Sequence, residues 1–183
     1  MLTLYDYGDS GNGYKARLML ALLDRPWRLV ELDIMTGATH TPEFLVKNPD
    51  GRIPVLERED GSCLPESNAI LWYLAEGSPW LPAGEGEADR RLRADVLRWM
   101  CFEQCSHEPY VATSRFILRH LPADSPRRAE LPVRQEKGRA ALAMLDRHLQ
   151  GADWLAGGRY TIADIALYAY THRAEEAGIP LAP

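Results

Sequence analysis

The stretch NPDGRIPVLEREDGSCLPESNAILWYL, residues 48–74, contains the order of elements that decides the fold. It opens with the turn-forming residues Pro-Asp-Gly and continues into the run 53–57, Ile-Pro-Val-Leu-Glu, which is predicted to be a strand. The second residue of that run, Pro54, cannot donate a hydrogen bond to a neighbouring strand. Asp60-Gly61 is typical of a hairpin turn, so a second strand is expected before Pro65.

A helix is predicted directly after this hairpin. Ile70, Leu71 and Leu74 recur at the spacing of one helix face. Ser67 stands just before them, and serine favours the N-terminus of a helix. We therefore expect the second strand to lead through a polar corner into a helix that begins near Ser67.

The same corner offers three kinds of group to an extended peptide with a free amino-acid end. The proline pushes Ile53 into an extended conformation, in which its N–H and C=O lack a partner unless a ligand lies beside them. Glu66 is an acceptor for an ammonium, while Ser67 and the helix N-terminus are donors for a carboxylate. A simple helix cap and an ordinary trans X-Pro bond are the alternative, because each half of the pattern is common by itself.

Length, composition and charge limit the classes of function. At 183 residues the chain can form one large domain or two small ones, and 46% apolar with 26% charged residues is typical of a globular protein. A net charge of −5 does not indicate the basic face that nucleic acid requires. No apolar run approaches a membrane span, and the first residues lack the zones of a signal peptide. We expect a cytoplasmic protein without a nucleic-acid or membrane partner.

The three cysteines, Cys63, Cys101 and Cys105, predict neither a disulfide scaffold nor a redox pair, because they lack CxxC spacing. Glu103 and His107 lie near the last two in sequence. Four such ligands on one helix cannot converge on a tetrahedral ion, so we expect no metal site. Buried or half-buried thiols are the favoured interpretation.

The rest of the chain divides into an alternating first part and a helical second part. Before residue 48 we expect a strand at 2–5, a helix from Gly13 with Leu18, Ala21 and Leu22 on one face, a strand at 28–33, and a short helix near Thr41. Residues 78–88 are rich in proline and glycine and read as a linker. After them we expect a long helix over 89–119 bent at Pro109, an interruption at 121–132, a helix over 133–150, and a helix that starts with the capping box Thr161 to Asp164.

This combination resembles the cytosolic glutathione transferases over residues 1–177. In that family the residue before a cis-proline binds the cysteinyl backbone of glutathione, and a Glu-Ser or Gln-Ser pair holds its γ-glutamyl group; Ile53-Pro54 and Glu66-Ser67 match these features. The resemblance implies an α/β plus all-α fold: a thioredoxin-like, glutathione-binding N-terminal domain at 1–77, the linker 78–88, and a helical C-terminal domain at 89–183. Thr161 and Asp164 are then expected to serve folding. The chain stops at Pro183, where family members usually continue for one or two helices, so either a more open acceptor pocket or a shortened sequence is expected.

The family works by ionising the thiol of bound glutathione, since the thiolate is the nucleophile. Ser10, in the loop between the first strand and helix, resembles the hydroxyl residue of the serine-type and bacterial members, and Asn12 is expected to assist or substitute for it. A capping role for either residue is the alternative explanation. Tyr7 is a second candidate, because another branch uses a tyrosine from the end of this strand.

Further site residues are expected from the same resemblance. His40 and Arg52 are candidates for contact with the glycyl carboxylate. Candidates for the acceptor pocket on the long helix are Glu103, His107, Tyr110 and Arg115, with an ordinary polar helix stripe as the alternative. Trp99, Met100 and Phe102 are expected in the core.

The implied function is that of a glutathione transferase. Glutathione would be the co-substrate, its thiolate would attack a small electrophile in a detoxification reaction, and the protein would be a homodimer without a metal. Two alternatives stay open: a glutathione-dependent disulfide reductase or peroxidase, which would share the binding residues, and a non-catalytic interaction module of the same fold.

Overall fold

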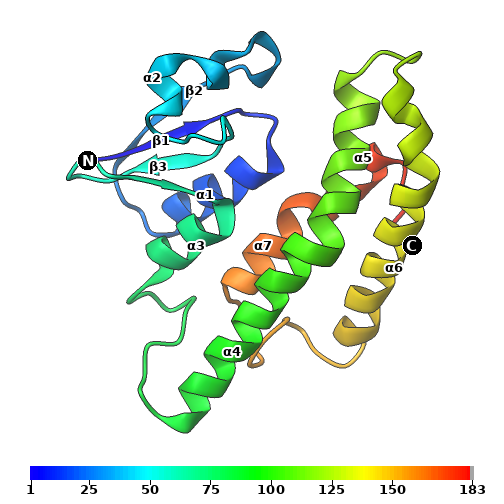
Figure 1. Cartoon of the computed structure of the whole chain (residues 1–183). Coiled ribbons are helices and arrows are strands. Elements are labelled where there is room, and N and C mark those ends of the chain that lie inside the picture. The colour runs from blue at the N-terminus through cyan, green and yellow to red at the C-terminus, as the bar shows by residue number, and fades with distance from the viewer. Residues whose placement is uncertain (182–183) are drawn as a thin grey trace. The chain divides into compact units, whose positions relative to one another are not determined.

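The structure is a computed structural model, and it describes residues 1–181. The chain forms two compact units, Met1–Ala83 and a second that begins at Gly84 (Figure 1). This boundary lies within the stretch 78–88 that the sequence marks as a linker.

The first unit is built on a four-stranded sheet in the order β2-β1-β3-β4. Strands β1 and β2 are parallel and are connected through helix α1, whereas β3 runs antiparallel to both β1 and β4. This is the expected thioredoxin-like arrangement. The strands are β1 (Leu2–Asp6), β2 (Trp27–Glu31), β3 (Val55–Glu57) and β4 (Cys63–Pro65), and the α-helices are α1 (Gly11–Leu22), α2 (Pro42–Leu45) and α3 (Ser67–Ala75).

Helices cover both faces of this sheet. Figure 1 shows α1 and α3 on one face and α2 on the other. The alternation of side chains along β1 follows this division: Asp6 meets Arg17 of α1, while the Tyr5 ring packs edge-on against Phe44 of α2. Burial on both faces explains why no residue of β1 is exposed.

Three local expectations in this unit need correction. Helix α1 begins at Gly11, two residues earlier than expected, and Pro54 precedes β3 instead of lying within it. The buried positions of α1 include Ala16, Met19 and Leu20, whereas Leu22 of the expected apolar face is exposed. Helix α1 contains so many apolar residues that their spacing alone does not distinguish its buried face from its exposed face.

The second unit consists of helices, as expected. The predicted break at Pro109 takes the form of a π-helical turn just before it, because proline has no N–H to continue the regular hydrogen-bond ladder. The long elements are α4 (Glu87–Phe102), the π-helical turn (Glu103–His107), α5 (Glu108–His120), α6 (Leu131–Leu149) and α7 (Ile162–Thr171).

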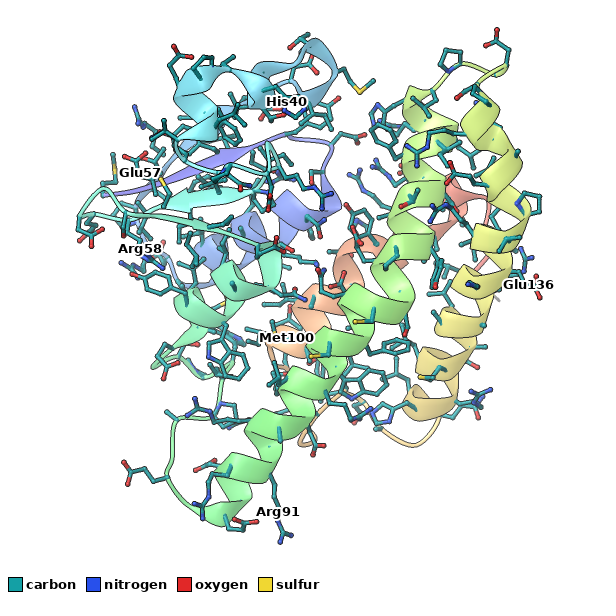
Figure 2. The ribbon with its side chains drawn as sticks, viewed as in Figure 1. His40, Glu57, Arg58, Arg91, Met100 and Glu136 are labelled. Carbon is teal, nitrogen blue, oxygen red and sulfur yellow. The ribbon has the colours of Figure 1, made fainter. Side chains whose placement is uncertain are left out.

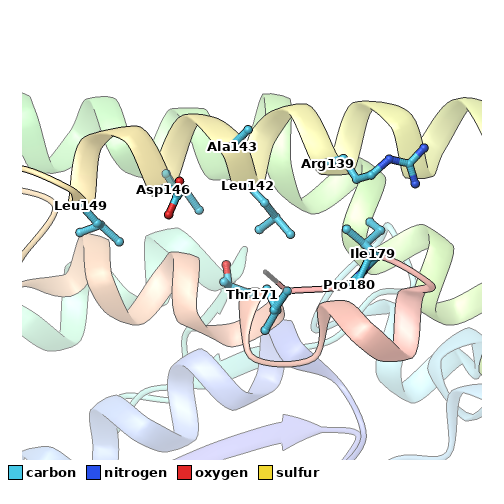
Figure 3. Close-up of a pocket in the computed structure, with 10 residues that line it drawn as sticks. Arg139, Leu142, Ala143, Asp146, Leu149, Thr171, Ile179 and Pro180 are labelled. Carbon is cyan, nitrogen blue, oxygen red and sulfur yellow. The ribbon is translucent and has the colours of Figure 1, made fainter. Parts of the chain in front are cut away.

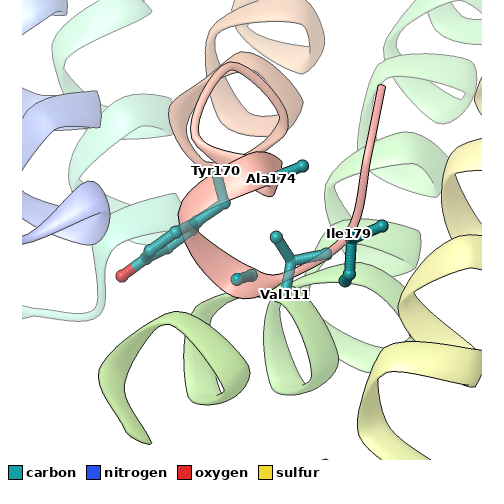
Figure 4. Packing of buried hydrophobic residues seen from close by; sticks show 5 residues of the cluster. Val111, Tyr170, Ala174 and Ile179 are labelled. Carbon is teal, nitrogen blue, oxygen red and sulfur yellow. The ribbon is translucent and has the colours of Figure 1, made fainter. Parts of the chain in front are cut away.

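Helix α7 is the buried element of this unit. It begins with the predicted capping box, in which Ala163 N–H donates to Thr161 Oγ1 (3.3 Å) and Thr161 N–H donates to Asp164 Oδ2 (2.8 Å). Tyr170, near the end of α7, belongs to an apolar cluster with residues of α5 and of the segment 174–179 (Figure 4). The members are Val111, Tyr170, Ala174, Ala177 and Ile179.

Two of the three cysteines differ from the expectation of buried or half-buried thiols. Cys101 and Cys105 are exposed on the surface, and only Cys63 is half-buried. Burial raises the pKa of the Cys63 thiol. Over residues 1–181, no helix combines the length and apolar character that crossing a membrane demands.

Candidate functional site

The loop after β1 is held in one shape by Arg17. This residue of α1 forms an ion pair with the fully buried Asp6 carboxylate. Its guanidinium also donates to the backbone carbonyls of Gly8 (3.0 Å) and Ser10 (3.3 Å). Gly13 lies so close to the Asp6 carboxylate that a side chain there would overlap it. These contacts therefore restrict the position of Ser10 within the loop.

Ser10 is the N-cap of α1, and its side-chain oxygen accepts a hydrogen bond from Gly13 N–H at 3.2 Å. The hydroxyl hydrogen can still be donated, because this bond uses only an oxygen lone pair. Capping and donation to a ligand at the helix N-terminus are consequently compatible.

The tyrosines near this loop have other surroundings. Tyr5 donates its hydroxyl hydrogen to Glu57 at 2.7 Å, on the α2 face of the sheet. Tyr7 lies after the end of β1 and is half-buried, and its carbonyl accepts from Ser10 N–H at 2.8 Å. Its suggested role as a thiol donor stays a prediction.

Asn12 on α1 is linked to the start of α3. Ser67 donates its hydroxyl hydrogen to Asn12 Oδ1 at 3.2 Å. The amino group of Lys15 donates to Ser67 Oγ at 3.2 Å and to Asn68 Oδ1 at 3.3 Å. Lys15 is completely buried, and it was not among the site residues predicted from the sequence. It lies four residues before the buried Met19, so the two side chains share one face of α1. Knowledge of which face of α1 is buried would therefore have predicted that Lys15 is buried too.

The corner between β3 and α3 brings the other candidates close together. The Ile53-Pro54 peptide bond is cis, as the resemblance implies. Val55 pairs with Pro65 across the hairpin, and this register places Glu66 opposite Pro54. Among residues 1–181, no hydrogen bond is found for the Ile53 backbone.

Glu66 itself has an unusual backbone. Its φ of 71° lies in the region that favours glycine, and its side chain is exposed, while the next residue, Ser67, is buried. Non-glycine residues with such backbone angles are concentrated at ligand-binding sites. Glu66 is the N-cap residue of α3 but forms no side-chain capping bond, so its carboxylate is not used by the helix.

His40 and Arg52 are exposed residues of the loops around α2, and Figure 2 labels His40. Gly51, with a φ of +63°, lies against the His40 ring, and any side chain at this glycine would collide with the imidazole. The buried Asn48, which the sequence interpretation missed, donates to the Arg52 carbonyl at 2.8 Å. It thereby shapes the chain leading to Ile53.

The family model for the glutathione S-transferase N-terminal domain matches residues 1–76, and the model for the C-terminal domain matches residues 112–181. The glutathione S-transferase GST-4.5 of Xanthomonas campestris pv. campestris is 32% identical over 152 residues, which cover 82% of this chain and 74% of that protein. This chain belongs to the glutathione S-transferase family.

This chain is also similar to proteins that have other names. The disulfide-bond oxidoreductase YfcG of Escherichia coli K12 is 30% identical over the whole chain and 84% of its own length. Elongation factor 1-gamma-B of Xenopus laevis is 32% identical over 90% of the chain, which spans only 37% of that protein. A crystal structure of a glutathione S-transferase from Pseudomonas fluorescens has 49% identity and a TM-score of 0.91, covering 98% of this chain and 87% of that one.

The four acceptor-pocket candidates of this chain lie within the helical unit. Glu103 and His107 are fully buried, and His107 Nε2 lies 3.0 Å from Thr171 Oγ1. Arg115 is nearly buried and pairs with Glu176 at 2.7 Å. Tyr110 is half-buried, with the Lys137 amino group 5.2 Å from its ring centre. Glu103 accepts from Gln104 Nε2 at 2.9 Å, so all four have partners within the helical unit, and their role toward an acceptor stays a prediction.

The helical unit also contains a largely apolar cavity of about 380 Å³ between α6, the end of α7 and the residues 179–181 (Figure 3). None of the predicted site residues lines it, although the lining residue Thr171 contacts His107. Its lining residues are Arg139, Leu142, Ala143, Leu145, Asp146, Leu149, Thr171, Ile179, Pro180 and Leu181.

Proposed function

We propose that this protein is a glutathione transferase whose N-terminal unit binds glutathione and stabilises its thiolate. Ser10 donates to the sulfur with the assistance of Asn12, and Glu66 accepts from the γ-glutamyl ammonium. Ser67 and the α3 N-terminus bind the γ-glutamyl carboxylate. The Ile53 backbone before Pro54 pairs with the cysteinyl residue, and His40 and Arg52 serve the glycyl carboxylate.

The observation that carries this proposal is the joining of α1 to the corner after β4. The bond from Ser67 to Asn12 (3.2 Å) and the register that sets Glu66 opposite Pro54 bring the peptide-binding groups to the loop of Ser10. An extended tripeptide needs a backbone partner, an acceptor for its ammonium and donors for its carboxylate, and this corner provides one of each.

The proposed chemistry is activation of a thiol. A free thiol has a pKa near 8.5, and lowering it by about 2 units requires about 2.7 kcal/mol of selective stabilisation of the anion. Ser10 and the N-terminus of α1 would supply this stabilisation, since both favour negative charge beside them. The thiolate then attacks an electrophilic carbon, a carbon–sulfur bond forms, and the leaving group departs with its electron pair.

A second candidate is a glutathione-dependent disulfide reductase, which is favoured by the similarity to YfcG. It would use the same binding residues and differ in the electrophile, which would be a disulfide sulfur. The similarity to elongation factor 1-gamma-B supports a third candidate, a non-catalytic module. Glu66 weighs against that one, because its exposed carboxylate does not cap α3 and a pure scaffold has no need of it.

Calorimetric titration with glutathione, followed by assays with an aryl halide and with hydroxyethyl disulfide, separates these candidates. We expect binding and turnover of the aryl halide. Turnover of the disulfide alone would establish the reductase, and absence of binding would favour the module.

The role of Ser10 is tested with Ser10→Ala. We expect the pKa of bound glutathione, followed by the ultraviolet absorbance of the thiolate, to rise by about 1 to 2 units. Ser125→Ala is the matched control, because Ser125 caps a short 3-10 helix of the other unit without a side-chain bond. An unchanged pKa in Ser10→Ala would remove Ser10 from its proposed role. Homodimer formation, cytoplasmic location and a part in detoxification stay predictions.

A further inference from the structure

Lys15 is a buried cation at the start of α3. It lies on α1 with no exposed surface, and its amino group is 3.2 Å from Ser67 Oγ and 3.3 Å from Asn68 Oδ1. Both oxygens belong to the first turn of α3. A lysine ammonium only donates, so both oxygens accept from it. The positive charge is therefore held at the helix end to which the γ-glutamyl carboxylate is assigned in the proposed function.

The hydroxyl of Ser67 is not needed to bind that carboxylate. Its oxygen accepts from Lys15, and its hydrogen is donated to Asn12 Oδ1 at 3.2 Å. Ser67 is the first residue of α3, so its backbone N–H has no partner within the helix and is a donor for an anion. Ser67 can therefore bind the carboxylate through its backbone while its side chain is bonded to Lys15 and Asn12.

Charges of opposite sign lie close to Ser67. Glu66 precedes it, is exposed and does not cap α3, whereas Lys15 contacts the Ser67 side chain from the interior. The free amino-acid end of glutathione also has both charges, an ammonium and a carboxylate on one carbon atom. Glu66 alone would attract the ammonium but repel the carboxylate. The charge of Lys15 offsets this repulsion, and because it is buried, salt screens it much less than a surface charge.

Hydrogen bonding alone does not explain a lysine at this position. Joining α1 to α3 requires a donor for the two oxygens, and the neutral amide of a glutamine is such a donor. Burial of a charged group costs more free energy than burial of a neutral donor. The property that only the lysine adds to this contact is its positive charge.

We propose that Lys15 is a specificity-determining residue, whose buried charge makes the start of α3 prefer a ligand with a charged carboxylate at its amino-acid end over one in which this group is neutral. This inference rests on the proposed function, because it requires that glutathione binds at this corner. Lys15 does not touch the ligand; its charge acts on the carboxylate from behind Ser67.

The test compares glutathione with an analogue in which the γ-glutamyl carboxylate is a carboxamide, a group of the same shape without the charge. Calorimetry measures the affinity of both ligands for the wild type, for Lys15→Met and for Lys15→Gln. We expect the wild type to prefer glutathione by about fiftyfold. Each substitution should lower the affinity for glutathione by about tenfold and change the affinity for the carboxamide by less than about twofold, which leaves a preference of about fivefold from the helix N-terminus.

The two substitutions at Lys15 separate charge from hydrogen bonding, because glutamine keeps an N–H donor and methionine has none. A loss of affinity confined to Lys15→Met, or equal losses for the two ligands, would assign Lys15 a purely structural role and overturn the inference. Lys47→Met is the matched control. It removes a lysine charge from the same unit, where Lys47 pairs with Glu57 and lies over the Tyr5 ring, and it should keep the wild-type preference.

The wild-type protein decides the matter if neither Lys15 variant folds. A helix N-terminus alone supplies a preference for the carboxylate of up to about fivefold, so the expected fiftyfold requires the buried charge, and a preference of fivefold or less would overturn the inference. Wild-type protein that binds neither ligand would refute the proposed function. Wild-type protein that binds glutathione without the expected preference would refute this inference alone.

Discussion

The Asp6 carboxylate and the Arg17 guanidinium form an ion pair where β1 ends and the loop to α1 begins. Asp6 is fully buried, and 20% of the Arg17 side chain is exposed. The same guanidinium donates hydrogen bonds to the backbone carbonyls of two loop residues, Gly8 and Ser10. The ion pair therefore stabilises the fold and also determines where the Ser10 hydroxyl lies.

Arg17→Met is expected to lower the free energy of unfolding by about 3 kcal/mol, because it leaves the Asp6 carboxylate buried without its cation. Urea denaturation measures this loss. Arg91→Met is the matched control: Arg91 pairs with Glu87 on the exposed surface of α4, and its removal should have no measurable effect. Equal stabilities of the two variants would contradict a structural role for the buried pair.

Glu66→Gln is expected to weaken glutathione binding by about ten- to a hundredfold, because a hydrogen bond to a charged group contributes about 1.5 to 3 kcal/mol. Stability should not change, since the side chain is exposed and does not cap α3. Calorimetry measures the affinity of the variant for glutathione and for an analogue that lacks the γ-glutamyl amino group. The variant should lose little affinity for the analogue. A similar loss for both ligands would show that Glu66 does not contact the ammonium.

Lys47 and Glu57 should make stability depend on pH. The hydrogen bond from Lys47 (2.6 Å), together with the one from Tyr5, holds the pKa of Glu57 below its ordinary value, and the bond to Glu57 raises the pKa of Lys47. A carboxyl with a lowered folded-state pKa stabilises the fold above its unfolded pKa of about 4.3, and this contribution is lost as pH falls through the folded-state value. The raised pKa of Lys47 means that its contribution is present below about pH 10.4 and is lost as pH rises through the folded-state value.

Lys47→Met is therefore expected to lower the free energy of unfolding by about 1 kcal/mol at neutral pH, since the pair is only partly exposed. The difference from the wild type should shrink as pH falls below about 4.3 and through the lowered folded-state pKa of Glu57, because the carboxyl loses the charge that pairs with Lys47. Urea denaturation at neutral pH and in this acidic range measures it. A difference that stays constant between them would exclude the ion pair as its cause.

Thr161→Ala is expected to lower the free energy of unfolding by about 1 to 2 kcal/mol, because it removes the N-cap of the buried helix α7. Asp164→Ala should cost more, since Asp164 also accepts from Leu155 N–H at 2.9 Å. Thermal unfolding measures both changes, and calorimetry should show unchanged affinity of the folded proteins for glutathione. Weakened binding would assign these residues more than a folding role.

The sequence alone was sufficient for the order of elements and for the local chemistry of turns and caps. The capping box at Thr161 and the corner at Glu66-Ser67 were recognisable because turns and helix starts depend on a few neighbouring residues. What only the tertiary structure decided was which face of α1 is buried, and therefore that Lys15 reaches Ser67. Such contacts join residues 52 positions apart in the sequence and depend on how two helices pack against the sheet, which no local pattern of residue types specifies.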